Sequence, residues 1–321
     1  MRVSSMFARP FELVYRWRKK PAAAIPLWPA AVGYLSRRYR YLFCTTDELR
    51  HIPRFDGTII VDDDDPSFTA EHLALLNYPN VAVVVTPTEL LRQRLLKEGL
   101  RKPCLVIPSG VDFSSLDPTR VASIRRRLKD DETRLVVGFA LPRIYTNEDL
   151  GAEAGEKALR SISFLCGAME MVWEEMPDVE LWLMGRPSRS VRSYAKAHSQ
   201  VKLLGYVRHS DVLDYFTNFD IAVYPRLMDV GGRHSIKLLE SMACGIPVVS
   251  TDVSESFLVQ ESGAGLISSG VEDFAGNILR LAKDATLRER LGQKGREFAK
   301  PFNWDVLAER YRREVLDVFA P

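Results

Sequence analysis

From about residue 134 onward, short apolar runs alternate with longer amphipathic stretches, and this alternation constrains the fold more than any other feature of the sequence. The apolar runs predict strands at LVVGFA (135–140), VELWLMG (179–185), VKLLG (201–205), DIAVYP (220–225), IPVVST (246–251) and AGLIS (264–268). The stretches between them predict helices near 156–176, 188–198, 210–217 and 235–244. Strands that alternate with helices form βαβ units, so we expect an α/β fold with a doubly wound parallel sheet. Ligands bind such sheets beyond the carboxyl ends of the strands.

The first 113 residues show a weaker form of the same pattern. Strands are predicted at RYLFCTT (40–46), TIIVDDD (58–64), VAVVVTP (81–87) and CLVIPSG (104–110), with a helix near 88–99. Residues 114–133 are polar and charged, which indicates a boundary, because linkers are rich in such residues. After the second domain, helices are predicted near 271–283, 287–299 and 304–319.

Charge and composition narrow the class of protein. The net charge is +2, yet residues 1–43 carry nine Lys and Arg against the single Glu12. This basic segment has two interpretations, an anionic membrane surface as partner or a solvated helix face. We expect no nucleic-acid partner, because no recognised motif accompanies the charge. No apolar stretch reaches the roughly 18 residues of a membrane span, so we expect a cytoplasmic protein, peripheral at the inner face of the membrane under the first interpretation.

Four scattered cysteines lack metal-site spacing, and we interpret them as reduced core thiols.

The segment from Ser235 to Asp252 carries the clearest indication of a ligand. Ser235 is suited to cap a helix that ends near Gly245, and an apolar strand follows. Free amides of the first turn, with Arg233, His234 and Lys237 beside them, predict hydrogen bonds and positive potential for a diphosphate. Glu240 lies one turn deeper on the same face as Lys237 and is placed to accept hydroxyl protons from a ribose.

Taken together, the motifs between about residues 104 and 319 resemble the C-terminal half of GT-B glycosyltransferases of family 4, the glycosyl transferases group 1. Those that carry the resemblance are LVIPSGVD, VGFALPR, VELWLMG, VKLLGYV, DIAVYP, KLLESMACGIPVVSTD and LRERLGQKGREFAKPFNW. The resemblance implies a GT-B fold of two Rossmann-like, doubly wound parallel-sheet domains. It places a reduced acceptor-side domain at 1–113, a nucleotide-sugar-binding domain at 114–303, and a helix at 304–321 that packs back on the first domain.

For function, the resemblance implies a retaining, metal-independent transferase without a cofactor. Such an enzyme moves a sugar from a nucleotide-diphosphate-sugar donor to a glycan, a lipid-linked carrier or a small-molecule acceptor. Two alternatives stay open: a catalytically inactive nucleotide-sugar-binding or scaffold protein of GT-B fold, and a sugar-nucleotide epimerase on the same fold. The short first domain and Gly232 favour the inactive alternative, because Gly232 stands where the family carries the first of two acidic residues eight positions apart.

The resemblance also assigns residues. Glu240 matches the second acidic position, and Asp229 supplies the first at a shifted register. Arg143 matches the first member of a diphosphate-binding Arg/Lys pair, whereas Glu148 stands at the second. The expected catalytic residues are Glu240, Asp229, Arg143 and Lys237. The expected nucleotide-sugar-binding residues are Arg143, Gly185, Tyr206, Val207, Arg233, His234, Ser235, Ile236, Lys237 and Glu240. Asp62 and Asp63 are expected on the acceptor side, with a helix-capping acidic turn as the plainer interpretation; no metal site is expected.

Overall fold

The structure is a computed structural model that describes residues 39–49, 55–64, 66–128, 133–153, 162–227 and 231–319. They divide into two compact units. Unit 1 comprises Met1–Ser109, Gly232–His234 and Trp304–Pro321, and unit 2 comprises Gly110–Gly231 and Ser235–Asn303. Unit 2 begins at Gly110 rather than at residue 114, because Val111 pairs with Asn303 at the other end of the same unit.

Unit 2 is built on a six-stranded sheet in which all neighbouring strands are parallel. Its strands are β5 (Val136–Ile144), β6 (Glu180–Pro187), β7 (Val201–Gly205), β8 (Ile221–Tyr224), β9 (Val248–Thr251) and β10 (Gly265–Ser268). The order across the sheet is β10-β9-β8-β5-β6-β7. Counted from β5, this is the 3-2-1-4-5-6 order of doubly wound nucleotide-binding sheets, which confirms the predicted fold class. The order reverses between β5 and β8.

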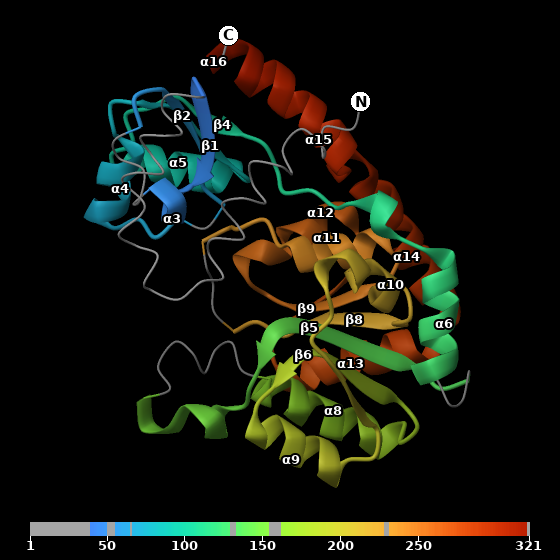
Figure 1. The fold of residues 1–321 in the computed structure, drawn as a ribbon. Coiled ribbons are helices and arrows are strands. Elements are labelled where there is room, and N and C mark those ends of the chain that lie inside the picture. The colour runs from blue at the N-terminus through green and yellow to red at the C-terminus, as the bar shows by residue number, and fades with distance from the viewer. Residues whose placement is uncertain are drawn as a thin grey trace. The chain divides into compact units, whose positions relative to one another are not determined.

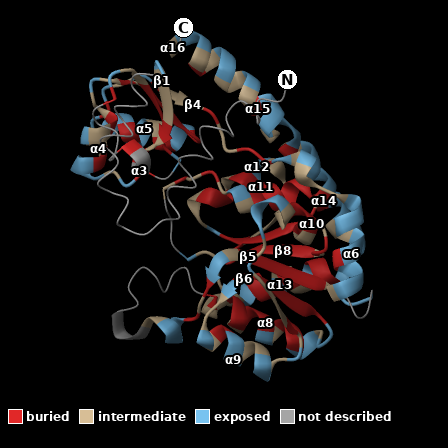
Figure 2. Cartoon of the chain, viewed as in Figure 1, coloured by how far each residue is buried: buried red, intermediate tan, exposed pale blue. Residues whose placement is uncertain are grey.

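Helices cover both faces of this sheet (Figure 1). One face packs on α8 (Ser163–Glu175), α9 (Arg189–Ala197) and α13 (Val271–Lys283). The other packs on α10 (Val212–Phe216), α11 (Ile236–Ala243) and α12 (Phe257–Ser262). Figure 2 shows the strands buried and the outward faces of the helices exposed, as expected for parallel strands whose both faces carry apolar side chains.

Helix α14 (Ala285–Ala299) follows α13 and packs closely against α11. The approach depends on Gly292, because a Cβ atom added there would lie 2.0 Å from the carbonyl oxygen of Gly245. Gly276, in α13, has open space at the corresponding position. These two helical glycines therefore have different roles: only Gly292 is required by packing.

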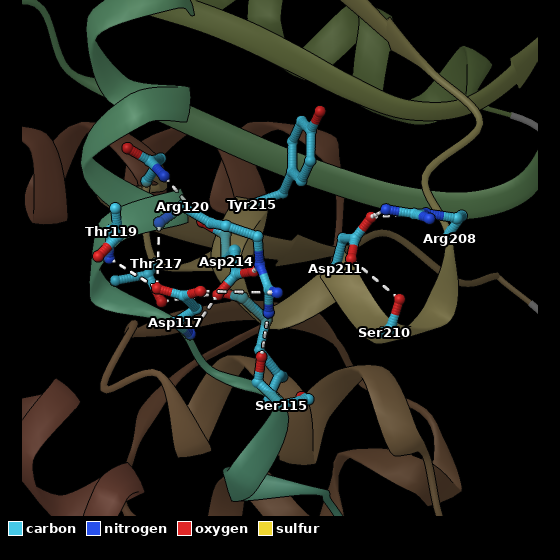
Figure 3. Close-up of polar contacts among 12 residues, drawn as sticks. Ser115, Asp117, Thr119, Arg120, Arg208, Ser210, Asp211, Asp214, Tyr215 and Thr217 are labelled. Carbon is cyan, nitrogen blue, oxygen red and sulfur yellow. Dashed lines mark hydrogen bonds and ion pairs between the residues drawn. The ribbon is translucent and has the colours of Figure 1, made fainter.

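Helix α6 (Pro118–Leu128) forms where the sequence predicted only a polar boundary. Figure 3 shows why the helix is held against unit 2: the fully buried carboxylate of Asp214, on α10, accepts hydrogen bonds at both oxygens. Arg120 Nε donates to Oδ2 over 2.6 Å and Asp117 N donates to Oδ1 over 2.7 Å. The prediction missed this helix because the carboxylate that anchors it lies nearly a hundred residues later in the chain.

Unit 1 contains a four-stranded parallel sheet in the order β1-β2-β3-β4. Its elements are β1 (Tyr41–Thr45), α3 (Thr46–Leu49), β2 (Thr58–Asp62), α4 (Ala70–Leu76), β3 (Val81–Thr86), α5 (Glu89–Lys97) and β4 (Cys104–Val106). Helices α3 to α5 cover one face, where Leu49, Leu76 and Leu95 join Ile59 and Val61 in a core. The order of these strands never reverses.

The C-terminal segment covers the other face of this sheet. It runs through α15 (Trp304–Arg310), a π-helical stretch η7 (Tyr311–Leu316) and α16 (Asp317–Phe319). Leu307 and Val315 pack with Ile60 and Val83 in one buried cluster. Arg310 Nη2 also donates to the carbonyl oxygen of Val106 over 3.2 Å. The segment therefore belongs to the core of unit 1, although the residues just before it belong to unit 2.

All four cysteines are buried and free, as predicted for core thiols. Burial raises the pKa of the Cys104 thiol to about 11 and that of the Cys244 thiol to about 12, so both stay protonated at neutral pH. Across the described ranges, no helix combines the length and apolar character needed to span a bilayer.

Candidate functional site

The reversal of strand order places the candidate site of unit 2 between β5 and β8. At such a point the connections leave the sheet in opposite directions, so a crevice opens at the carboxyl ends of the two strands. The connection after β8 begins with Pro225 and Arg226 and leads to α11. The end of β5 carries Arg143. The sheet of unit 1 has no reversal among its described strands.

Helix α11 begins at Ile236, with Ser235 in the N-cap position. The backbone of Ser235 is extended, as an N-cap requires, but its side chain makes no capping hydrogen bond. Ser235 therefore occupies the predicted N-cap position, without a capping hydrogen bond from its side chain. Because this side chain does not claim the amides of the first turn, they remain available to an anionic ligand.

Lys237 and Glu240 are the two ionisable residues on α11, and both are poorly solvated. The side chain of Glu240 is 7% exposed, and burial raises its pKa from 4.5 to about 7, an effect that the Lys237 charge partly opposes. Burial likewise lowers the pKa of Lys237, the Glu240 charge raises it, and the Arg226 charge lowers it further. Among the described residues, no hydrogen bond reaches the Glu240 carboxylate. Buried polar groups are normally bonded, so an unsatisfied carboxylate is typical of a ligand site.

Arg226 and Glu255 add a pair that the sequence reasoning did not identify. Arg226 Nη1 lies 3.2 Å from Glu255 Oε1, and the Glu255 side chain is almost fully buried. Thr251 fixes the backbone nearby, because its hydroxyl donates to the carbonyl oxygens of Tyr224 and Arg226. The position of Arg226 directly after a strand was a usable signal. Its partner lies 29 residues later and has no local signature.

Arg143 and the neighbouring residue Arg186 occupy paired register positions at the ends of β5 and β6. Both are exposed. The guanidinium carbon of Arg186 lies 4.9 Å from the ring centroid of Tyr206, whose side chain is 61% exposed. Arg186 was also missed from sequence. An exposed ring with a cation over one face provides a surface on which a flat ligand can stack.

The glycine and valine that were predicted at this edge serve the backbone and the core. Gly185 has φ of +149°, and a Cβ atom there would lie 1.8 Å from the carbonyl oxygen of Leu141. Its conformation and the close strand approach therefore require glycine, whichever ligand binds. Val207 is partly buried against the core that contains α11.

Gly232, Arg233 and His234 group with unit 1 rather than with the residues of α11. Thr88 Oγ1 donates to the carbonyl oxygen of Gly232 over 2.8 Å, and Gly232 has φ of +79°. This left-handed conformation explains why glycine replaces the acidic residue of the family pattern. His234 was predicted to add positive potential, and this is wrong: burial lowers its pKa to about 4, so the ring is neutral at pH 7.

Asp62 and Asp63 end β2 in unit 1. Asp63 is buried; Thr46 Oγ1 donates to its Oδ1 over 2.8 Å, and His72 Nε2 lies 2.9 Å from its Oδ2. Burial, the charge of Asp64 and that of Asp63 raise the pKa of Asp62 to about 7, while a hydrogen bond from Tyr311 lowers it. Neither acid caps the next helix, because Thr69 does. The Asp63 carboxylate is therefore held within unit 1, whereas Asp62 is only partly buried.

Some predictions fall on residues outside the described ranges. Asp229 lies in one such segment, as does most of the basic segment 1–43. Over the residues that are described, no group of three or more His, Cys, Asp or Glu side chains is arranged to hold a metal ion.

Comparison with known proteins shows a similarity to glycosyltransferases. Residues 154–284, which contain β6 to α13, match the family described as "Glycosyl transferases group 1". This similarity covers less than half of the chain. The chain is similar to a D-inositol 3-phosphate glycosyltransferase of Kribbella flavida, with 25% identity over 64% of this chain and 48% of that protein. It is also similar to a phosphatidyl-myo-inositol mannosyltransferase of Mycobacterium leprae, with 27% identity over 70% of this chain and 56% of that protein.

The chain spans about half the length of these curated relatives. Its fold is shared with Anabaena HepE, solved in complex with UDP-glucose, at a TM-score of 0.71 and 15% identity over 93% of this chain and 84% of that one. A sucrose-phosphate synthase of Thermosynechococcus elongatus gives a TM-score of 0.68 at 18% identity over 92% of this chain and 79% of that one. These similarities establish a GT-B fold of two Rossmann-like domains.

Proposed function

We propose that this chain is a glycosyltransferase that uses a nucleotide-diphosphate sugar as donor and retains the configuration of the transferred sugar. The observation that carries the proposal is the Lys237 and Glu240 pair on α11. One buried carboxylate without a hydrogen bond and one partly buried ammonium stand one turn apart at the switch point of a doubly wound sheet. Two relatives, which match 64% and 70% of this chain, are named a D-inositol 3-phosphate glycosyltransferase and a phosphatidyl-myo-inositol mannosyltransferase.

In this proposal, each group at the site has a chemical task. Glu240 accepts hydrogen bonds from the ribose hydroxyls, which supply the donors that its carboxylate lacks. The diphosphate lies against Lys237 and the first amides of α11. When the bond between the anomeric carbon and the phosphate oxygen breaks, negative charge grows on the departing diphosphate. Fixed cations and amides aimed at that charge stabilise the transition state more than the ground state.

The acceptor hydroxyl forms the new bond on the face from which the diphosphate departs, and the departing phosphate oxygen takes its proton. This route needs no protein nucleophile and retains configuration. The acceptor class is a polyol, a glycan or a lipid-linked carrier, in keeping with relatives whose names refer to inositol phosphate and phosphatidylinositol. Asp62, at the end of β2 in unit 1, is proposed on the acceptor side.

The first experiment measures donor binding and turnover together. UDP-, GDP- and ADP-sugars are titrated into the purified chain by calorimetry, and nucleoside diphosphate release is followed with and without a glycolipid and polyol extract. Acceptor-dependent release supports the transferase. Binding without release supports the scaffold alternative, and interconversion of the donor without acceptor supports the epimerase.

The matched variants are Glu240→Ala and Glu289→Ala. Glu289 is exposed on α14 and makes no polar contact among the described residues. Loss of two hydrogen bonds to a charged acceptor, at about 1.5–3 kcal/mol each, predicts at least a hundredfold weaker nucleotide binding for Glu240→Ala and no change for Glu289→Ala. Equal affinities of the two variants would show that the ribose does not bind at Glu240.

A further inference from the structure

Charged side chains lie on both the β5 side and the β8 side of the switch point of unit 2. After β5, the cation Arg143 is followed by Glu148 and Asp149 on η3 (Asn147–Glu153). Asp149 is occupied locally, because Thr146 N and Ser188 Oγ donate to its carboxylate. After β8, the first charged residue is Arg226, and Lys237 follows on α11. A dianion on the β8 side of this crevice therefore meets two cations, Arg226 and Lys237.

Arg226 is held in a way that leaves most of its donors unused. A guanidinium has five N–H groups, and among the described residues the side chain forms one ion pair, from Nη1 to Glu255 Oε1 at 3.2 Å. Its side chain is 22% exposed, whereas Glu255 is 1% exposed. The buried carboxylate of Glu255 thus holds one N–H edge of the planar guanidinium, and the other N–H groups can bind a second anion.

Arg226 also lies within electrostatic range of the site on α11. Its charge contributes to lowering the pKa of Lys237. Two like charges near each other are unfavourable unless an anion lies between or beside them. Glu255 neutralises only one of the two, and Glu240 is itself poorly ionised because of burial.

We infer that Arg226 is a diphosphate-binding residue of this chain, and that Glu255 is the positioning residue that holds its guanidinium at the carboxyl end of β8. This inference rests on the proposed function and extends it, because it assigns the diphosphate to the β8 side of the crevice. Arginine suits the task, since its fork binds phosphate oxygens in pairs and stays charged. Thr251 supports the geometry by bonding the carbonyl oxygens on either side of Pro225.

The experiment compares nucleoside 5′-monophosphates with diphosphates. Calorimetry of wild type with UMP and UDP, GMP and GDP, and AMP and ADP first identifies the base that binds best. The ratio of the two affinities for that base is the wild-type preference for diphosphate over monophosphate. Arg226→Ala is expected to weaken diphosphate binding about 10- to 100-fold and monophosphate binding much less. Arg226→Lys retains the charge without the fork and is expected to fall between wild type and Arg226→Ala.

Glu255→Gln distinguishes positioning from a merely structural ion pair. As a single substitution, Glu255→Gln should reduce the preference for diphosphate over monophosphate several-fold and leave monophosphate affinity unchanged. When Arg226→Ala is already present, adding Glu255→Gln should not change that preference further. The reason is that Glu255 acts on the diphosphate only through Arg226. The control is Arg280→Ala, an exposed arginine in the last turn of α13. That helix starts at the carboxyl edge of the sheet and runs back, so Arg280 lies at the amino edge.

The outcomes separate the two hypotheses. If wild type binds none of the six nucleotides, the proposed function fails, and this inference fails with it. Glu240→Ala is expected to weaken the binding of monophosphates and diphosphates equally. If it does, but Arg226→Ala and Arg226→Lys keep the wild-type preference for diphosphate within twofold, the proposed function stands and only the inference about Arg226 is overturned. A preference lost in Arg226→Ala and kept in Arg280→Ala supports it. Should Arg226→Ala not fold, Arg226→Lys alone decides, by the same preference.

Discussion

Replacing Glu240 by glutamine should make the protein more stable above neutral pH and weaken nucleotide binding at the same time. Glutamine keeps the shape of the side chain but cannot ionise. In wild type, burial raises the pKa of Glu240 from 4.5 to about 7. A carboxyl group whose pKa is raised in the folded state favours folding only while it is protonated. Its contribution is therefore complete below pH 4.5 and is lost as the pH rises through about 7.

The magnitude follows from the same pKa change. One pKa unit corresponds to about 1.4 kcal/mol, so the rise to about 7 represents a cost of about 3 kcal/mol when Glu240 is ionised in the folded protein. Glu240→Gln removes that cost. The variant should match wild type within about 1 kcal/mol at pH 5, where both side chains are uncharged. At pH 8 its free energy of unfolding should exceed that of wild type by about 2–3 kcal/mol.

The assay is urea unfolding at pH 5 and pH 8 of three proteins: wild type, Glu240→Gln and the exposed control Glu289→Gln. The transition of unit 2 is followed by the fluorescence of Trp173 and Trp182. The control should lie within about 0.5 kcal/mol of wild type at both pH values. Nucleotide titrations on the same samples should show weaker binding for Glu240→Gln. A stability difference that is the same at pH 5 and pH 8 would refute the claim that Glu240 is ionised at a cost in the folded state.

Two further predictions concern packing. Gly292→Ala should lower the free energy of unfolding of unit 2 by about 1–3 kcal/mol, because the added Cβ would collide with the backbone of Gly245. Gly276→Ala should raise it by up to about 1 kcal/mol, because alanine has the higher helix propensity and the space is open. Equal effects of the two variants in thermal unfolding would contradict this account. Leu307→Ala, which truncates a side chain only 2% exposed, should destabilise unit 1 by about 2–5 kcal/mol, while the neighbouring Val306→Ala, at 48% exposed, should change little. Amide exchange in β2 and β3 measures the difference, and unchanged protection in Leu307→Ala would show that α15 does not stabilise this sheet.

The sequence by itself determined the class of fold and predicted the edge of the sheet at which we propose that the donor binds. Its apolar runs are short and separated by amphipathic stretches, and this alternation indicates parallel βαβ units. The helix that carries Lys237 and Glu240 could be placed because its apolar stripe, its terminating glycine and the following strand are all local signals. Helix α6 was missed because the carboxylate of Asp214 that anchors it lies far along the chain.

The tertiary structure decided which of the candidate side chains are charged and which are already occupied. The pKa of His234 depends on burial by surrounding chain, and Asp63 is occupied by Thr46 and His72, which lie on other elements. Arg226 gains its position from Glu255, a partner supplied by the loop after the adjacent strand. Desolvation and ion pairing depend on distance in space, and a linear pattern of residues carries that information only within a helix turn or a strand.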